Sequence, residues 1–122
     1  MGENKIILIV DDDKEICLLL KEFLEERGFE IRIAHDGQKA IELAENHVPD
    51  LVITDLLLPK EHGVDVMREI KDRFFTPIIA ISGIYHQDEV RKKIDDIYLE
   101  GFYEKPLNLE ALYKGIQAIL NE

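Results

Sequence analysis

The stretch KIILIVDDDKEI, Lys5 to Ile16, decides the fold, because it joins a run of apolar residues directly to three acids. A short apolar run rich in β-branched residues, here 6–10, predicts a buried strand. Asp11, Asp12 and Asp13 follow at once. Two carboxylates about 5 Å apart repel each other by roughly 3 kcal/mol at an effective dielectric constant near 20. Either these acids point into water or a cation binds among them.

Strand and helix patterns alternate along the rest of the chain. Apolar or alternating runs predict strands at 6–10, 29–34, 50–59, 76–83 and 101–106. Apolar residues at helical spacing predict helices within 13–29, 36–47, 63–74, 86–99 and 108–120. Apolar strands joined by helices form a parallel sheet with helices on both faces, so we expect an α/β domain. The alternation in 29–34 places that strand at an edge of the sheet.

The first helix shows how the core is expected to form. Helical spacing turns five apolar residues inward: Ile16, Leu19, Leu20, Phe23 and Leu24. Cys17 falls among these leucines, which favours a core thiol over a reactive one. Gly28 stands where a helix ends in a left-handed residue.

Composition limits the classes of function. The 122 residues suit one domain, and the 46% of apolar residues exclude a disordered chain. A single cysteine excludes an internal disulfide framework, and the missing signal pattern predicts a cytoplasmic protein. The net charge of −11 argues against direct nucleic-acid binding, because an acidic surface repels phosphates.

Polar residues stand at the carboxyl end of four predicted strands. In open parallel sheets, ligands bind at this edge. The four ends carry Asp11, Asp12 and Asp13; Thr54 and Asp55; Ser82 and Gly83; and Lys105 and Pro106. Each residue by itself has an ordinary explanation, such as a loop acid or a turn serine. The occurrence of such residues at the carboxyl ends of four strands of one sheet predicts a binding site there.

The acidic loop after the first strand indicates what this site binds. A phosphate-cradling loop needs glycines or hydroxyls there, and this loop has none. Oxygen ligands attract a hard cation, and a small set of them suits Mg²⁺. Asp13 is expected to be the N-cap of the following helix, which needs only one such residue. Asp11 and Asp12 are left for the cation.

Four blocks of the chain, in order, resemble the receiver domain of two-component response regulators. ILIVDDDKEI resembles the first strand and acid pair of that family, and PDLVITDLLLPKEHG resembles its phosphoacceptor strand and loop. PIIAISG and GFYEKPL resemble the hydroxyl-bearing strand and the lysine–proline element. The resemblance spans essentially the whole chain. It implies a single receiver domain over 1–122 without an effector domain, and a flavodoxin-like, doubly wound sheet with strand order 2-1-3-4-5.

The resemblance also implies a role for individual residues. Asp55 would be the phosphoacceptor. The ligands of Mg²⁺ would be Asp11, Asp12, Asp55 and the backbone carbonyl of Leu57. Ser82 and Lys105 would contact the phosphoryl group, and Phe102 would be the switch aromatic. The Lys105–Pro106 bond would be cis.

The implied activity is a switch rather than a turnover enzyme. A sensor histidine kinase or a histidine phosphotransfer protein would donate the phosphoryl group. A protein partner would then read the face formed by the helix at 86–99, the strand at 101–106 and the helix at 108–120. A homodimer through this face is left open, and neither nucleic acid nor a membrane is expected as a partner.

The sequence departs from the family pattern at a few positions. His62 stands where an acid is common, and the four histidines, at 35, 47, 62 and 86, lack metal-ligand spacing. Leu57 and Ile84 lie two residues beyond Asp55 and Ser82. In the family these two positions flank the water that hydrolyses the phosphoryl group. Both are apolar here, so the sequence predicts a long-lived phosphoryl group.

Two other functions compete with this interpretation. A receiver-like scaffold would bind partners without phosphorylation, although the full set of acids, hydroxyl and lysine argues against it. A phosphatase with an aspartate nucleophile uses a D-x-D pattern after its first strand, which Asp11 and Asp13 satisfy formally. Such enzymes usually need a cap insertion, for which this chain has no room.

Overall fold

The computed structural model describes residues 4–56, 63–83 and 97–121. In this part of the chain, five parallel strands form one sheet in the order β2-β1-β3-β4-β5. Their bounds are β1 Ile6–Val10, β2 Glu30–Ala34, β3 Leu51–Asp55, β4 Ile78–Ser82 and β5 Gly101–Glu104. The predicted α/β class, the strand order and the edge position of the second strand are confirmed.

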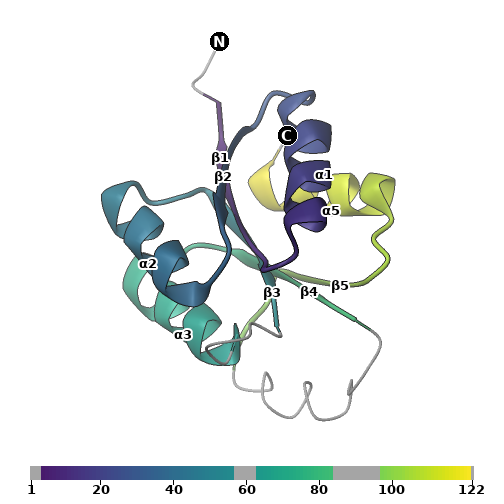
Figure 1. The fold of residues 1–122 in the computed structure, drawn as a ribbon. Helices are drawn as coiled ribbons and strands as arrows, with labels where there is room; N and C mark the ends of the chain where they lie inside the picture. The colour runs from purple at the N-terminus through teal and green to yellow at the C-terminus, as the bar shows by residue number, and fades with distance from the viewer. Residues whose placement is uncertain (1–3, 57–62, 84–96, 122) are drawn as a thin grey trace.

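Helices cover both faces of the sheet (Figure 1). Their bounds are α1 Lys14–Glu25, α2 Gly37–Asn46, α3 Gly63–Phe74 and α5 Leu109–Leu120. Most of the predicted helix at 86–99 lies outside the described residues. None of the helices in the described part of the chain has the length and apolar character that crossing a membrane requires.

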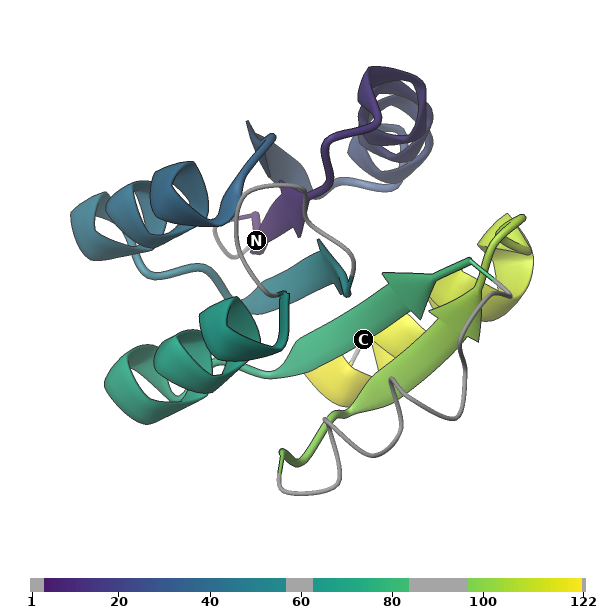
Figure 2. The ribbon, with the colours of Figure 1, turned by 60° about the horizontal axis from the view of Figure 1, so that its bottom comes forward.

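The core consists of two layers, one on each face of the sheet. Helices α1 and α5 lie on one face, and α2 and α3 lie on the other, as Figure 2 also shows. Every residue of the central strands β1, β3 and β4 is buried. Side chains that alternate along each strand divide between the two layers, so that Ile7 and Ile9 face α1 while Leu8 and Val10 face α2.

The start and end of α1 follow the local chemistry. The Asp13 carboxylate accepts hydrogen bonds from the backbone N–H groups of Glu15 and Ile16, at 2.9 and 3.3 Å, and is the predicted N-cap. Gly28 follows the helix with a φ of 93°, as expected. Cys17 is buried and is the predicted core thiol.

The predicted inward face of α1 is wrong at Leu19. Its side chain is 47% exposed, whereas Cys17, Leu20 and Leu24 are fully or almost fully buried. Helical spacing allowed either Cys17 or Leu19 to face inward, because apolar residues occupy both sides of that turn. The small Cys17 thiol lies against the sheet instead, so the buried face of α1 contains Cys17, Leu20 and Leu24.

Candidate functional site

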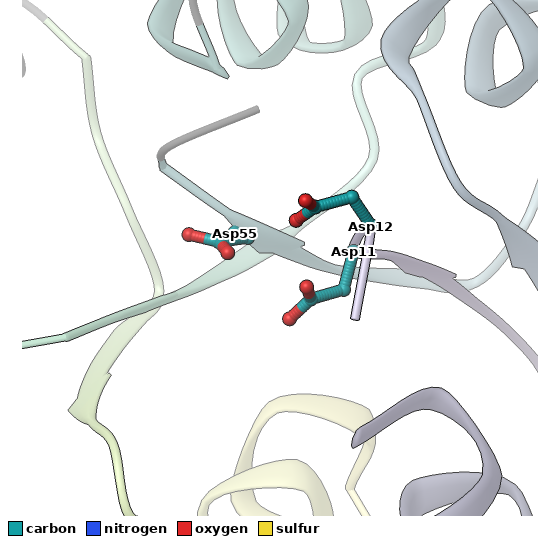
Figure 3. A group of neighbouring side chains, drawn as sticks. All are labelled: Asp11, Asp12 and Asp55. Carbon is teal, nitrogen blue, oxygen red and sulfur yellow. The ribbon is translucent and has the colours of Figure 1, made fainter. Parts of the chain in front are cut away.

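Three carboxylates meet at the carboxyl edge of the sheet. Asp11 and Asp12 follow β1 directly, and Asp55 is the last residue of β3. One carboxylate oxygen of each lies within 4.8 Å of the others. Figure 3 shows Asp11 and Asp12 coming from the end of β1 toward Asp55. Because β1 and β3 are parallel neighbours with Val10 paired to Thr54, the fold places these acids side by side.

Asp11 is the most deeply held of the three acids. Its side chain is completely buried, and Oδ1 accepts a hydrogen bond from the Asp13 backbone N–H at 2.9 Å. Burial raises the pKa of the Asp11 carboxyl, although the Asp13 N–H and the Lys105 ammonium act against that rise. Asp12, by contrast, is exposed. The loop therefore presents one fixed buried acid and one that faces solvent.

Lys105, which directly follows the edge strand β5, contacts two of these acids. Its Nζ lies 3.0 Å from Asp55 Oδ2 and 3.0 Å from Asp11 Oδ2. Burial by itself lowers the pKa of the Lys105 ammonium, but the contacts with the Asp11 and Asp55 carboxylates outweigh it and raise the pKa overall. Lys105 therefore stays charged at neutral pH and offsets part of the negative charge of the acids.

The backbone fixes Lys105 in this position. Its N–H donates to the Ser82 carbonyl oxygen at 2.7 Å, which ties the end of β5 to the end of β4. The peptide bond between Lys105 and Pro106 is cis, the isomer that the family resemblance implies. These contacts place a cation from one strand beside an acid from another.

Ser82 and Phe102 lie on the strands next to this cluster. Ser82 ends β4, is buried, and donates a hydrogen bond from Oγ to the Gly83 carbonyl oxygen at 3.2 Å. Phe102 lies on β5, is half-buried, and packs against the core layer that contains α3. Ser82 therefore lies at the strand end that the sequence predicts for it, and Phe102 lies within β5, three residues before Lys105.

Comparisons with known proteins agree with this arrangement. Residues 7–117 match the family model described as the response regulator receiver domain. The chain belongs to this family. It is 36% identical over 118 residues to the transcriptional regulatory protein CpxR of Escherichia coli (strain K12), covering 96% of this chain and 49% of that protein. It is 32% identical over 120 residues to the alkaline phosphatase synthesis transcriptional regulatory protein PhoP of Bacillus subtilis (strain 168), with coverage of 96% and 49%.

Solved structures of receiver proteins superpose on the whole domain. A two-component response regulator from Clostridium difficile matches with a TM-score of 0.90 and 31% identity, covering 98% of each chain. The chemotaxis response regulator CheY4 of Vibrio cholerae matches with a TM-score of 0.84 and 26% identity, covering 95% of this chain and 98% of that one. The receiver domain spans about half the length of the curated relatives it matches.

The acids of this receiver domain fit a hard divalent cation. Three carboxylates supply the oxygen ligands that Mg²⁺ prefers. Asp11 Oδ2 is buried and accepts no hydrogen bond of good geometry within the described part of the chain. Lys105 contacts this oxygen as an ion pair. A cation among these oxygens would relieve the repulsion that the opening stretch of sequence implies.

Two residues near the acids were not predicted to belong to the receiver site. The Cys17 thiol donates to the Asp11 carbonyl oxygen at 3.3 Å, and His35 Nδ1 lies 3.0 Å from the same oxygen. Burial and the nearby acids raise the pKa of Cys17 to about 11, so the thiol keeps its proton at neutral pH. No sequence pattern signals these contacts, because their target is a backbone atom.

Two predicted residues of the receiver site, Leu57 and Ile84, fall outside the described part of the chain. His62 and His86, to which the sequence assigns no role in the site, lie outside it as well. Of the other two histidines, His47 follows α2 and His35 lies at the carboxyl edge. Neither belongs to the group of acids that could hold a metal ion among the described residues.

Proposed function

We propose that this receiver domain accepts a phosphoryl group on Asp55 from a histidine kinase or a histidine phosphotransfer protein. The placement of Asp55 carries the proposal. Its carboxylate ends β3 at the edge of the sheet, 3.0 Å from the Lys105 ammonium and beside Asp11 and Asp12. A carboxylate nucleophile beside a fixed cation suits phosphoryl transfer, which needs positioning and charge neutralisation more than covalent help.

Different residues would carry out different parts of the phosphoryl transfer. An Asp55 oxygen attacks phosphorus as the bond from phosphorus to the donor nitrogen breaks. The backbone of Lys105 is held by its hydrogen bond to the Ser82 carbonyl. Its side chain would move from the carboxylates to a phosphoryl oxygen. Asp11, Asp12, Asp55 and the carbonyl of Leu57 would hold Mg²⁺. When bound, this ion neutralises charge on the phosphoryl oxygens.

The switch follows from the new oxygens on Asp55. Ser82 Oγ, which now donates to the Gly83 carbonyl, would donate to a phosphoryl oxygen instead. That movement opens space beside the half-buried Phe102. The face that includes β5 and α5, with the helix predicted at 86–99, would then change shape for a protein partner. The net charge of −11 supports a partner that is protein rather than nucleic acid.

The geometry favours this function over a phosphatase with a D-x-D nucleophile. In that class, Asp11 would be the nucleophile and Asp13 its acid partner. Asp11 is completely buried, and the Asp13 side chain accepts the N–H groups that begin α1. The Asp11 carboxylate is thus completely enclosed and the Asp13 carboxylate is engaged as a cap, whereas Asp55 keeps an exposed fraction of 6% and lies beside a lysine and two acids.

Intact-protein mass spectrometry tests the proposal. The protein is incubated with MgCl₂ and acetyl phosphate, and we expect one phosphoryl adduct that is lost in Asp55→Asn. Asp36→Asn is the matched control, because Asp36 is an N-cap near the same edge and asparagine caps a helix equally well. No adduct on the wild-type protein would indicate a scaffold. An adduct kept in Asp55→Asn but lost in Asp11→Asn would indicate the phosphatase.

A further inference from the structure

We propose that Cys17 and His35 are positioning residues, which hold the peptide between Asp11 and Asp12 so that the Asp12 carboxylate faces the cation site. This inference rests on the proposed function, because it concerns the same acids. It assigns a role to a buried thiol and an exposed histidine that phosphoryl transfer does not itself require.

Both side chains donate to one backbone atom. The pairing of β1 with β2 ends at Val10 and Ala34, so the Asp11 carbonyl lies beyond the last paired residues. Cys17 Sγ reaches this oxygen from α1 at 3.3 Å. His35 Nδ1 reaches it at 3.0 Å from the loop after β2. A carbonyl oxygen only accepts, so the hydrogen of His35 is on Nδ1.

These contacts matter for Asp12 because a peptide unit is planar. Fixing the Asp11 carbonyl therefore fixes the direction of the Asp12 N–H and the position of its Cα. Asp11 itself is also held by its own N–H, which donates to the Ala34 carbonyl at 3.1 Å. Within the described part of the chain, the Asp12 carboxylate makes no hydrogen bond or ion pair of its own. The direction of its backbone is then what aims it at Asp55.

Packing alone does not explain both residues. Cys17 is buried and would fill its place in the core without a hydrogen bond. The His35 ring is exposed, so it gains little from burial, and its described polar contacts are with Asp11 and Cys17. Two side chains from separate elements, 3.9 Å apart, converge on the same oxygen. Hydrogen bonds to the groups that carry metal ligands orient those ligands, and their loss often changes metal affinity tenfold or more.

Isothermal titration calorimetry with MgCl₂ alone tests this role, using pairs of variants that keep or remove each donor. His35→Asn keeps a donor near the place of Nδ1, and His35→Leu removes it. Cys17→Ser keeps a donor, and Cys17→Ala removes it. His47→Leu is the control, because His47 is also exposed but follows α2, outside the acid cluster.

We expect His35→Leu and Cys17→Ala each to weaken Mg²⁺ binding about threefold, and the double variant about tenfold. Asparagine and serine should restore most of the affinity. In acetyl phosphate assays, the donor-free variants should need more Mg²⁺ for half-maximal rate yet reach the wild-type maximum. A general loss of structure would lower that maximum instead.

The results separate the inference from the proposed function. If the wild-type protein binds Mg²⁺ and forms the adduct, but His35→Leu and His35→Asn bind Mg²⁺ alike, the positioning role is wrong and the phosphoacceptor proposal stands. A wild-type protein that neither binds Mg²⁺ nor forms the adduct overturns both.

Discussion

Three adjacent aspartates of the same chain have three different environments. Asp13 caps α1 through two backbone N–H groups. Asp11 is buried between the Asp13 N–H and the Lys105 ammonium, and burial raises its pKa. Asp12 points into solvent on the side of Asp55. A single residue step in this loop therefore separates a helix cap from a candidate metal ligand, because each step turns the side chain toward a different neighbour.

At the residue scale, we predict that the side chains at 57 and 84 set the lifetime of phosphorylated Asp55. Leucine and isoleucine cannot orient the attacking water by hydrogen bonds. The double variant Leu57→Asn, Ile84→Glu should therefore lose its phosphoryl group on the order of tenfold faster, since better placement of a reactant accelerates a reaction by at least this much. The decay of the adduct in MgCl₂, followed by intact mass, measures the rate.

The control for this prediction is Leu18→Asn, which makes the same kind of change at a leucine that is 55% exposed on α1. Its decay rate should equal that of the wild-type protein. Equal decay rates in the double variant and the wild-type protein would show that the two apolar side chains do not limit hydrolysis.

At the scale of elements, β5 and α5 approach each other closely at Gly115. A Cβ atom built on Gly115 would lie 2.1 Å from the Tyr103 hydroxyl oxygen and 3.2 Å from its ring carbon Cζ. Tyr103 packs into the core layer under α1 and α5. A glycine in the middle of a helix lowers helix stability by about 1 kcal/mol relative to alanine. The close approach of the tyrosine explains why glycine occupies this position.

Gly115→Ala should therefore destabilise the domain by about 1–3 kcal/mol, although alanine favours a helix, because the added methyl group overpacks the contact with Tyr103. Urea unfolding followed by circular dichroism measures the change. In a Tyr103→Phe background the nearest clash is gone, so the same substitution should cost clearly less. Lys114→Ala, at an exposed neighbouring position, should change stability by less than about 0.5 kcal/mol. Equal costs in the two backgrounds would contradict the proposed contact.

At the scale of the whole molecule, negative charge opposes folding and is concentrated where the acids meet. The net charge is −11, and three of the carboxylates lie within 4.8 Å of one another. Sodium chloride should stabilise the domain gradually by screening this repulsion. A cation that binds specifically to the acids should add a larger effect.

We predict that MgCl₂ raises the unfolding temperature more than NaCl at equal ionic strength. A ligand at about one hundred times its dissociation constant adds about 2.7 kcal/mol to stability. Asp12→Asn should remove this excess and should be more stable than the wild-type protein without Mg²⁺, because it deletes one of the repelling charges. Thermal unfolding followed by circular dichroism tests both effects. The same MgCl₂ excess in Asp12→Asn would exclude Asp12 as a ligand.

The sequence by itself determined the alternation of strands and helices, the cap at Asp13, the left-handed Gly28 and the four strand ends that carry polar residues. These features depend on the local periodicity of apolar residues and on the conformational preferences of single residues. Both are properties of residues that are close together in the chain. The strand order and the roles of the individual site residues came from the likeness of four motifs to a family. Periodicity alone would not have supplied them.

Only the tertiary structure decided which side of a helix turn is buried and which backbone atoms receive side-chain hydrogen bonds. Both Leu19 and Cys17 fit the helical spacing. Cys17 is buried and Leu19 is exposed because the packing of α1 turns Cys17, and not Leu19, toward the sheet. His35 and Cys17 meet at the Asp11 carbonyl from separate elements, and Tyr103 lies over Gly115 across a strand and a helix. Contacts between residues far apart in the chain arise only when packing brings their elements together.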